Sequence, residues 1–255
     1  MSTTEIVTNP DLTGYENYSH DDVWGLGKLT DRMADAETLE DWSFILGDYI
    51  KVGNHKIAKN VAVFNLCAAA DCPNIDTDRC QVPKQFCYAY RDERTYQSKD
   101  GRGPLSYRRR QEYLWDCLDA ETFAGAFSLW KARKTSDVEI EFIRFNESGD
   151  IRHRGDILKI QRIAEILQKD GVSVYLYSAS NQLEWDILDE RSFVVNASND
   201  EMLQFADQRF GVVKTYDTDS SAIVCPFDAS DQQYKCGECR LCMTKHGKDI
   251  HIEIH

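Results

Sequence analysis

The chain has 255 residues, of which 42% are hydrophobic and 29% are charged, and its net charge is −13. This composition is that of a globular protein with a sizeable core, and the acidic balance argues against a generally basic nucleic-acid-binding surface. No apolar stretch approaches the roughly 20 residues that cross a bilayer, and the N-terminus lacks the features of a signal peptide. We therefore expect a cytoplasmic protein that does not engage a membrane.

The first half of the chain predicts an extension, one buried strand and a helical stretch. Residues 1–52 are acidic and polar, and we expect them to wrap on the main body with a short helix from Asp31 to Leu46. The apolar run Val61–Leu66 predicts a buried strand that ends directly before the first cysteine. Residues 104–134 favour helix, and we expect the basic run Arg108–Arg110 on its solvated face.

The second half alternates between strand-like and helix-like segments. Strands are expected at 139–145, 172–177, 192–196, 211–215 and 222–224, and helices at 155–169, 181–189 and 200–209. Strands separated by helices of about 10–15 residues are typical of βαβ units. The predicted fold class is α/β, a parallel sheet or partial barrel that carries cysteine-rich metal-binding loops. This domain should span residues 53–245, and the tail 246–255, with three histidines, should fray.

Eight of the nine cysteines form two groups. The members are Cys67, Cys72, Cys80 and Cys87 in the first, and Cys225, Cys236, Cys239 and Cys242 in the second. Because thiols stay reduced in the cytoplasm, we interpret these groups as metal ligands rather than disulfides. Four thiolates can hold a tetrahedral zinc or a [4Fe–4S] cluster. The sequence therefore predicts one or two metal centres.

The spacing differs between the two groups. Ten, two and two residues separate the cysteines of the second group, and four, seven and six separate those of the first. Three cysteines at the tighter spacing can bind one zinc only through a tight turn, which Gly237 relieves at one step alone. The second group therefore favours an iron–sulfur cluster over zinc. Unligated core cysteines are the alternative for the second group. The looser first group indicates ligation less strongly.

Polar side chains follow the strand that ends at Phe145. They are Asn146, Glu147, Ser148 and Asp150. Parallel α/β folds bind ligands at the carboxyl ends of their strands, so we expect these four residues to bind a cofactor or substrate. In the alternative interpretation the turn only caps the following helix. Arg144, Arg152 and His153 are the nearest candidates for a cationic partner or a proton carrier, with surface positions as the alternative.

A resemblance to a known family rests on four segments. These are Gly53–Asn60, Cys72 to Ala89, Ile143–Asp150, and Cys225-Pro226 to Cys242. They resemble elements of the gene product 88 family of phages and prokaryotes, over residues 53–245. The family pattern has three cysteines in the first group, which match Cys72, Cys80 and Cys87. Cys67 is then an addition, either a fourth ligand or a small buried side chain at a strand end.

The triplet Cys87-Tyr88-Ala89 resembles the cluster loop of radical S-adenosylmethionine enzymes, although their usual cysteine spacing of three and two residues is absent. The resemblance implies a [4Fe–4S] cluster on three thiolates, with one iron open for S-adenosylmethionine, and an auxiliary cluster on the second group. The substrate stays unidentified. The alternative is a zinc-stabilised, non-catalytic module that binds nucleic acid or a host protein, and it predicts unfolding on chelation.

Overall fold

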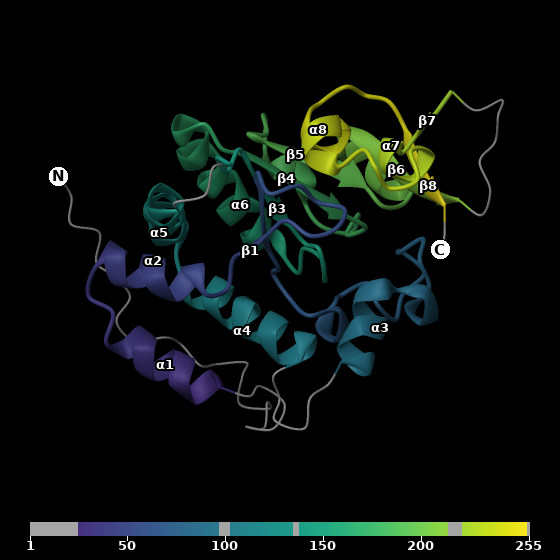
Figure 1. Cartoon of the computed structure of the whole chain (residues 1–255). Helices are drawn as coiled ribbons and strands as arrows, with labels where there is room; N and C mark the ends of the chain where they lie inside the picture. Colours follow the sequence, from purple (N-terminus) through teal and green to yellow (C-terminus); the bar gives the residue numbers. More distant parts are fainter. Residues whose placement is uncertain (1–24, 97–102, 135–137, 214–220, 254–255) are drawn as a thin grey trace.

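The computed structural model describes residues 25–96, 103–134, 138–213 and 221–253, and its main feature is an eight-stranded sheet with the order β1-β2-β3-β4-β5-β6-β8-β7 (Figure 1). The strands are β1 (Lys51–Val52), β2 (Val61–Phe64), β3 (Phe142–Phe145), β4 (Ser173–Ser178), β5 (Phe193–Ala197), β6 (Gln208–Val213), β7 (Ile223–Val224) and β8 (Ile250–Glu253). Only the β1–β2 pair is antiparallel. The predicted α/β class with a largely parallel sheet is confirmed.

The helices of the described ranges complete the fold. They are α1 (Leu26–Ala34), α2 (Leu39–Gly47), α3 (Tyr88–Thr95), α4 (Pro104–Cys117), α5 (Ala120–Arg133), α6 (Arg154–Leu167), α7 (Pro226–Ala229) and α8 (Cys236–Cys239). Every one of them is too short or too polar to cross a membrane. The helical stretch expected over 104–134 is divided in two, because Asp119 accepts a hydrogen bond from the Thr122 N–H at 2.6 Å and starts a new helix.

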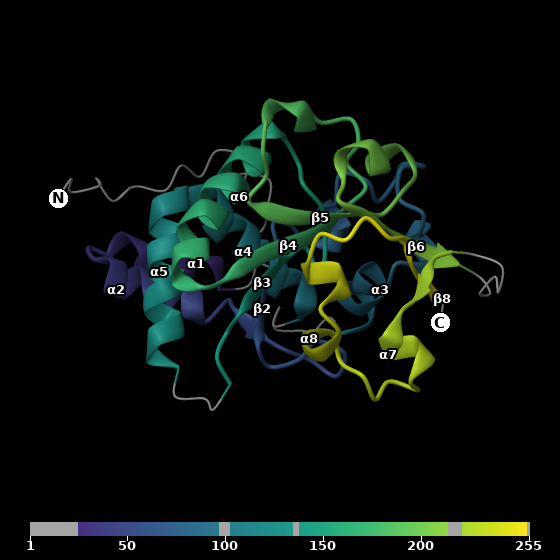
Figure 2. The same cartoon turned by 90° about the horizontal axis from the view of Figure 1, so that it is seen from above.

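The sheet separates two apolar layers. From β2 to β6 the strand order follows the chain, so right-handed crossovers place α4, α5 and α6 on one face (Figure 2). The larger core lies there, where Phe64, Trp115 and Phe145 pack together with Phe123. Trp42 of α2 is buried in the same core. The helix expected over 31–46 is two helices, since Thr38 and Asp41 form a capping box that starts α2.

The opposite face, called the inner face below, is covered by the C-terminal cysteine segment. Figure 2 shows α7 and α8 across the strands from the long helices. Val63, Phe142 and Tyr175 pack on this side with Met243 and Cys236. Because strand side chains alternate, Arg144 shares this face with Phe142, while Ile143 between them packs in the larger core. The inner face therefore brings strand residues against the second cysteine group.

Three expectations are corrected by the structure. The helices expected at 181–189 and 200–209 are short 3₁₀ turns, Trp185–Ile187 and Glu201–Phe205. In the first, the Trp185 indole donates to the Ser180 carbonyl at 2.9 Å, which closes a compact turn. The tail expected to fray contains β8, which pairs with both β6 and β7. Parts of the expected strand 211–215 lie outside the described residues.

Candidate metal centre

The first cysteine group lies on a loop that Asp150 fixes to the carboxyl edge of the sheet. One Asp150 oxygen accepts hydrogen bonds from Asn74 Nδ2 at 2.8 Å and from the Ala179 N–H at 2.7 Å. The other accepts from the Ile151 N–H at 2.7 Å. Burial raises the pKa of Asp150, and these hydrogen bonds oppose the rise. The predicted cofactor-binding aspartate thus joins the ends of β3 and β4 to the loop that follows Cys72.

The end of β5 holds the same loop through Asn199. Its amide nitrogen donates to the Arg79 carbonyl at 2.7 Å and to the Ala179 carbonyl at 2.9 Å. Its amide oxygen accepts from the Met202 N–H at 2.6 Å. Arg79 directly precedes Cys80, so the strand ends position this thiol. Polar residues at the carboxyl edge therefore anchor the cysteine loop.

Cys72, Cys80 and Cys87 are gathered by these contacts. Burial raises the pKa of Cys72 most strongly, and the nearby Asp150, Cys80 and Cys87 raise it further. The pKa of Cys80 is raised by burial, then by Asp150 and Cys87. All three side chains are partly exposed. Because a bound metal deprotonates its thiol ligands, three adjacent thiols form a donor set that fits a thiophilic metal.

Cys67 lies beneath this loop and is fully buried. Its Sγ donates to the Asp150 carbonyl at 3.6 Å. Gly149, with a φ of +72°, packs so closely that an added Cβ would lie 2.3 Å from this sulfur. Only glycine satisfies both the left-handed backbone and the close approach. Cys67 thus packs directly under the Ser-Gly-Asp turn.

Glu93 of α3 is a buried hydrogen-bond acceptor that the sequence did not indicate. Its two carboxylate oxygens accept from the N–H groups of Ala69 and the following residue, each at 2.8 Å. Arg108 donates to the same carboxylate at 2.8 Å, and both side chains are nearly inaccessible. Arg109 pairs with Asp71 at 2.7 Å. The expectation of a solvated arginine face is wrong, because α4 packs against the chain between the first cysteines.

The other predicted cofactor-binding residues differ in how they are used. Glu147 pairs with Lys51 at 3.2 Å and accepts from Asn54 at 2.8 Å. Ser148 is buried and donates its hydroxyl to Glu93 at 3.3 Å. Asn146 has a left-handed φ of 63° and a buried amide nitrogen without a hydrogen-bond partner among the described residues. Asn146 is thus the member of this set with a free donor.

The second cysteine group lies on the inner face of the sheet. Asn196 of β5 donates to the Cys242 carbonyl at 2.9 Å, and Gln208 of β6 donates to the Leu241 carbonyl at 3.0 Å. Burial raises the pKa of Cys242 to about 12, against a hydrogen bond from Tyr177 that lowers it. The remaining three thiols lie near enough to raise the same pKa. The four thiols of this group therefore share one neighbourhood.

The segment Gly53–Asn60 holds α8 in place. The Cys236 N–H donates to the Lys56 carbonyl at 3.1 Å. A Cβ at Gly237 would lie 2.2 Å from Asn60 Oδ1 and 2.4 Å from the Ala58 Cβ. Two motifs that are remote in sequence are thus packed into direct contact. The absence of a Cβ at Gly237 thus allows α8 to approach Ala58 and Asn60 closely.

The described residues hold no ready-made site of three metal-ligating His, Cys, Asp or Glu side chains. The two groups bring the right donors into proximity, and ligation requires their side chains to rotate towards one centre. The described histidines of the tail do not add to such a site. The ring of His246 contacts the Leu241 carbonyl at 3.0 Å, and His251 lies in β8. The third tail histidine lies outside the described residues.

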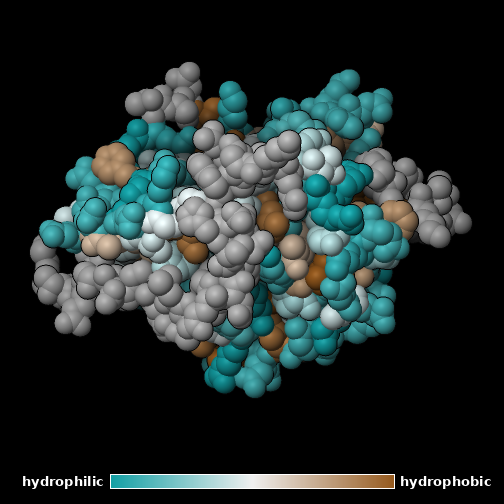
Figure 3. Space-filling model, turned by 90° about the horizontal axis from the view of Figure 1, so that it is seen from below, coloured by the Kyte–Doolittle hydropathy of each residue, from teal (hydrophilic) through white to brown (hydrophobic). Residues whose placement is uncertain are grey.

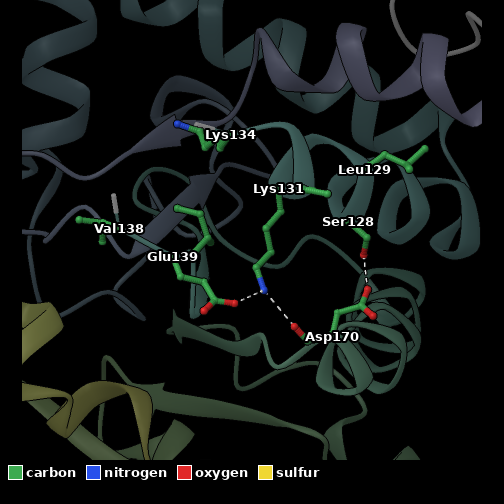
Figure 4. A pocket seen from close by; sticks show the side chains of 9 residues that line it. Ser128, Leu129, Lys131, Lys134, Val138, Glu139 and Asp170 are labelled. Atoms are coloured by element: carbon green, nitrogen blue, oxygen red, sulfur yellow. Dashed lines mark hydrogen bonds and ion pairs between the residues drawn. The ribbon is translucent and has the colours of Figure 1, made fainter. Parts of the chain in front are cut away.

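A cavity of about 620 Å³ lies at the opposite edge of the sheet. Lys131 crosses it and contacts Glu139 at 3.1 Å and the Asp170 carbonyl at 2.9 Å (Figure 4). These groups satisfy one another at the amino ends of the strands, away from both cysteine groups. On the face seen from below, the visible described residues are mostly hydrophilic, with apolar residues in small groups (Figure 3). The cysteine groups remain the better candidate site.

Comparisons with known proteins identify one match. A family model described as Gene product 88 matches residues 28–245, a range that begins in α1, upstream of Gly53, and ends after the last cysteine. No curated protein and no solved structure matches the chain.

Proposed function

The chain belongs to the gene product 88 family, and from this membership and its two thiol groups we propose that it is an iron–sulfur protein. The observation that carries the proposal is the gathering of Cys72, Cys80 and Cys87 on a loop anchored by three strand ends. Thiolates are the usual protein ligands of such clusters.

Three thiolates at the carboxyl edge suit a cluster with an open iron. The packing of Cys67 under Gly149 supports a ligand set of Cys72, Cys80 and Cys87. A [4Fe–4S] cluster held this way would bind S-adenosylmethionine at the open iron and supply the electron that cleaves it. The strand order from β2 to β6, which follows the chain, supports the radical S-adenosylmethionine-like part of the proposal. The protein positions these thiols by anchoring their loop through Asp150 and Asn199.

The second group has four thiols, which suits a closed auxiliary cluster. Its segment is fixed to the sheet through backbone carbonyls next to Cys242 and through the Cys236 N–H. These contacts hold the segment without using the sulfur atoms. Docking of the segment therefore does not require its sulfur atoms.

A zinc-stabilised, non-catalytic module is the second candidate function. It is favoured by the same docking of the second group, since a closed four-thiolate site is also the usual structural zinc site. In that case the metal would fasten the segment from β7 to β8 onto the inner face. The exposed rim would bind nucleic acid or a host protein.

The test is the metal content of protein purified without oxygen. Iron, sulfide and zinc are measured together with absorption near 400 nm in the wild type, Cys72→Ser, Cys236→Ser and Cys117→Ser. Cys117 lies in α4 outside both groups and serves as the control. We expect roughly eight irons per chain, about half lost in each of the first two variants, and no loss in the control. Zinc without iron would contradict the cluster and support the second candidate.

A further inference from the structure

Arg144 is a cation at the centre of the sheet. It lies in β3 opposite Val63 on one side and Tyr175 on the other, and its side chain is on the inner face. The guanidinium lies 4.6 Å from the centre of the Tyr177 ring. A charge in such a place is unfavourable unless a counter-charge and hydrogen-bond acceptors accompany it.

One counter-charge among the described residues, Glu147, lies near Arg144 but forms no ion pair with it, although the cation lowers the pKa of Glu147 against the effect of burial. No carboxylate among them lies within ion-pair distance of Arg144, and its sole hydrogen bond, to the Asn146 carbonyl, is long at 3.5 Å. The buried Nε has no acceptor. The nearby Glu147 is engaged by Lys51 and Asn54. A guanidinium has five N–H donors, so most of those of Arg144 are left for another acceptor.

Other shielded arginines of this protein are treated differently. Arg108 faces Glu93, Arg191 faces Asp207, and Arg152 faces Asp116 and Asp156. The fold therefore supplies a carboxylate wherever one of these side chains is withdrawn from water. Arg144 departs from this rule, and the donor of Asn146 at the end of the same strand is unpartnered too.

The position of Arg144 connects the two cysteine groups. Tyr88, next to Cys87, donates its hydroxyl to the Glu147 carbonyl and lies near enough to Arg144 for the cation to influence its pKa. On the other side, Tyr177 contacts both the guanidinium and the Cys242 thiol. A ligand at Arg144 would therefore lie between the proposed metal centres.

We propose that Arg144 binds the oxyanion group, carboxylate or phosphate, of a small-molecule ligand on the inner face. Guanidinium binds both groups through two parallel hydrogen bonds, and the aromatic face of Tyr177 holds its plane in position. The inference deepens the proposed function by naming the ligand class, and it rests on that function for the metals on either side.

The test is a calorimetric titration of the purified full-length protein with inorganic phosphate and, separately, malonate, at constant ionic strength. The variants are Arg144→Met and, as the control, Arg162→Met, which removes an exposed arginine that pairs with Glu121. We expect the wild type and Arg162→Met to bind one anion equally, and Arg144→Met to bind it roughly tenfold or more weakly. The anion bound more tightly identifies the source of the oxyanion.

The inference is overturned if the wild type binds neither anion, or if Arg144→Met binds as tightly as the wild type. Should Arg144→Met not fold, the Nε–H signal of Arg144 is followed by nuclear magnetic resonance in the wild type, with Arg144→Lys to assign it. A shift on anion addition supports the site, and an unmoved signal contradicts it. Metal content is measured on the same samples, so protein that binds anion without metal would refute the proposed function alone.

Discussion

The buried pair of Glu93 and Arg108 allows a sharp prediction about stability. Their side chains are 1% and 9% exposed and lie 2.8 Å apart. Glu93→Ala leaves the Arg108 charge buried without its carboxylate, and removal of one partner of a buried pair typically costs about 3–5 kcal/mol. The variant also strips two backbone N–H groups near Ala69 of their acceptors. We expect the free energy of unfolding to fall by about 3–5 kcal/mol, as measured by urea denaturation.

An exposed pair of the same kind provides the control. Arg162 and Glu121 lie 2.7 Å apart, but their side chains are 50% and 45% exposed. Exposed pairs contribute about 0–1 kcal/mol, so Glu121→Ala should change stability little. The double variant Glu93→Ala/Arg108→Met should be more stable than Glu93→Ala alone, because it removes the orphaned charge. Equal losses in Glu93→Ala and Glu121→Ala, or no coupling to Arg108, would refute the reasoning.

Three further predictions concern pH, crowding and ligation. Burial raises the pKa of Glu112 from 4.5 to about 8, so folding favours its protonated form. The wild type should therefore lose on the order of 3 kcal/mol of stability, relative to Glu112→Gln, as the pH rises from 4.5 to 8. Denaturant titration of both proteins at each pH measures this loss. Gly149→Ala should lower the free energy of unfolding by roughly 1–3 kcal/mol more than Gly171→Ala, as measured by urea denaturation. Both glycines have a φ near +72°, but only a Cβ added at Gly149 would have other atoms within 4 Å. Equal losses of stability would contradict this crowding. Cys67→Ala should keep the iron that Cys72→Ser loses, and equal iron loss by elemental analysis would make Cys67 a ligand.

The sequence was informative where a pattern is local. Alternating strands and helices predict the parallel sheet, and the polar residues after Phe145 correctly indicate its carboxyl edge. The alternation of Ile250 and Ile252 with His251 and Glu253 is a strand signal that could have predicted β8. The spacing of the three histidines in this tail, which fits no closed metal site, favoured a frayed terminus instead.

The sequence was uninformative where burial depends on distant partners. Arg108 and Arg144 are both arginines in predicted regular structure, and nothing local separates the one with a buried carboxylate from the one without. Glu93 likewise appears as an ordinary helix residue until α3 and α4 are packed together. Asp150 is predicted to bind a ligand, and in the structure its oxygens also accept hydrogen bonds from the cysteine loop. The sequence does not show this second role, because Asn74 is remote from Asp150 along the chain.

The place of β8 between β6 and β7 has a consequence for the order of folding. β6 remains an unpaired edge until β8, which follows the second cysteine segment in the chain, arrives beside it. That pairing joins residues far apart in sequence and is therefore slow to form. A metal that gathers Cys225 and Cys242 early would shorten the effective loop between β7 and β8 and speed this last closure. A metal bound by the second group would thus accelerate folding, and until β8 pairs, the exposed edge of β6 is open to pairing with other chains.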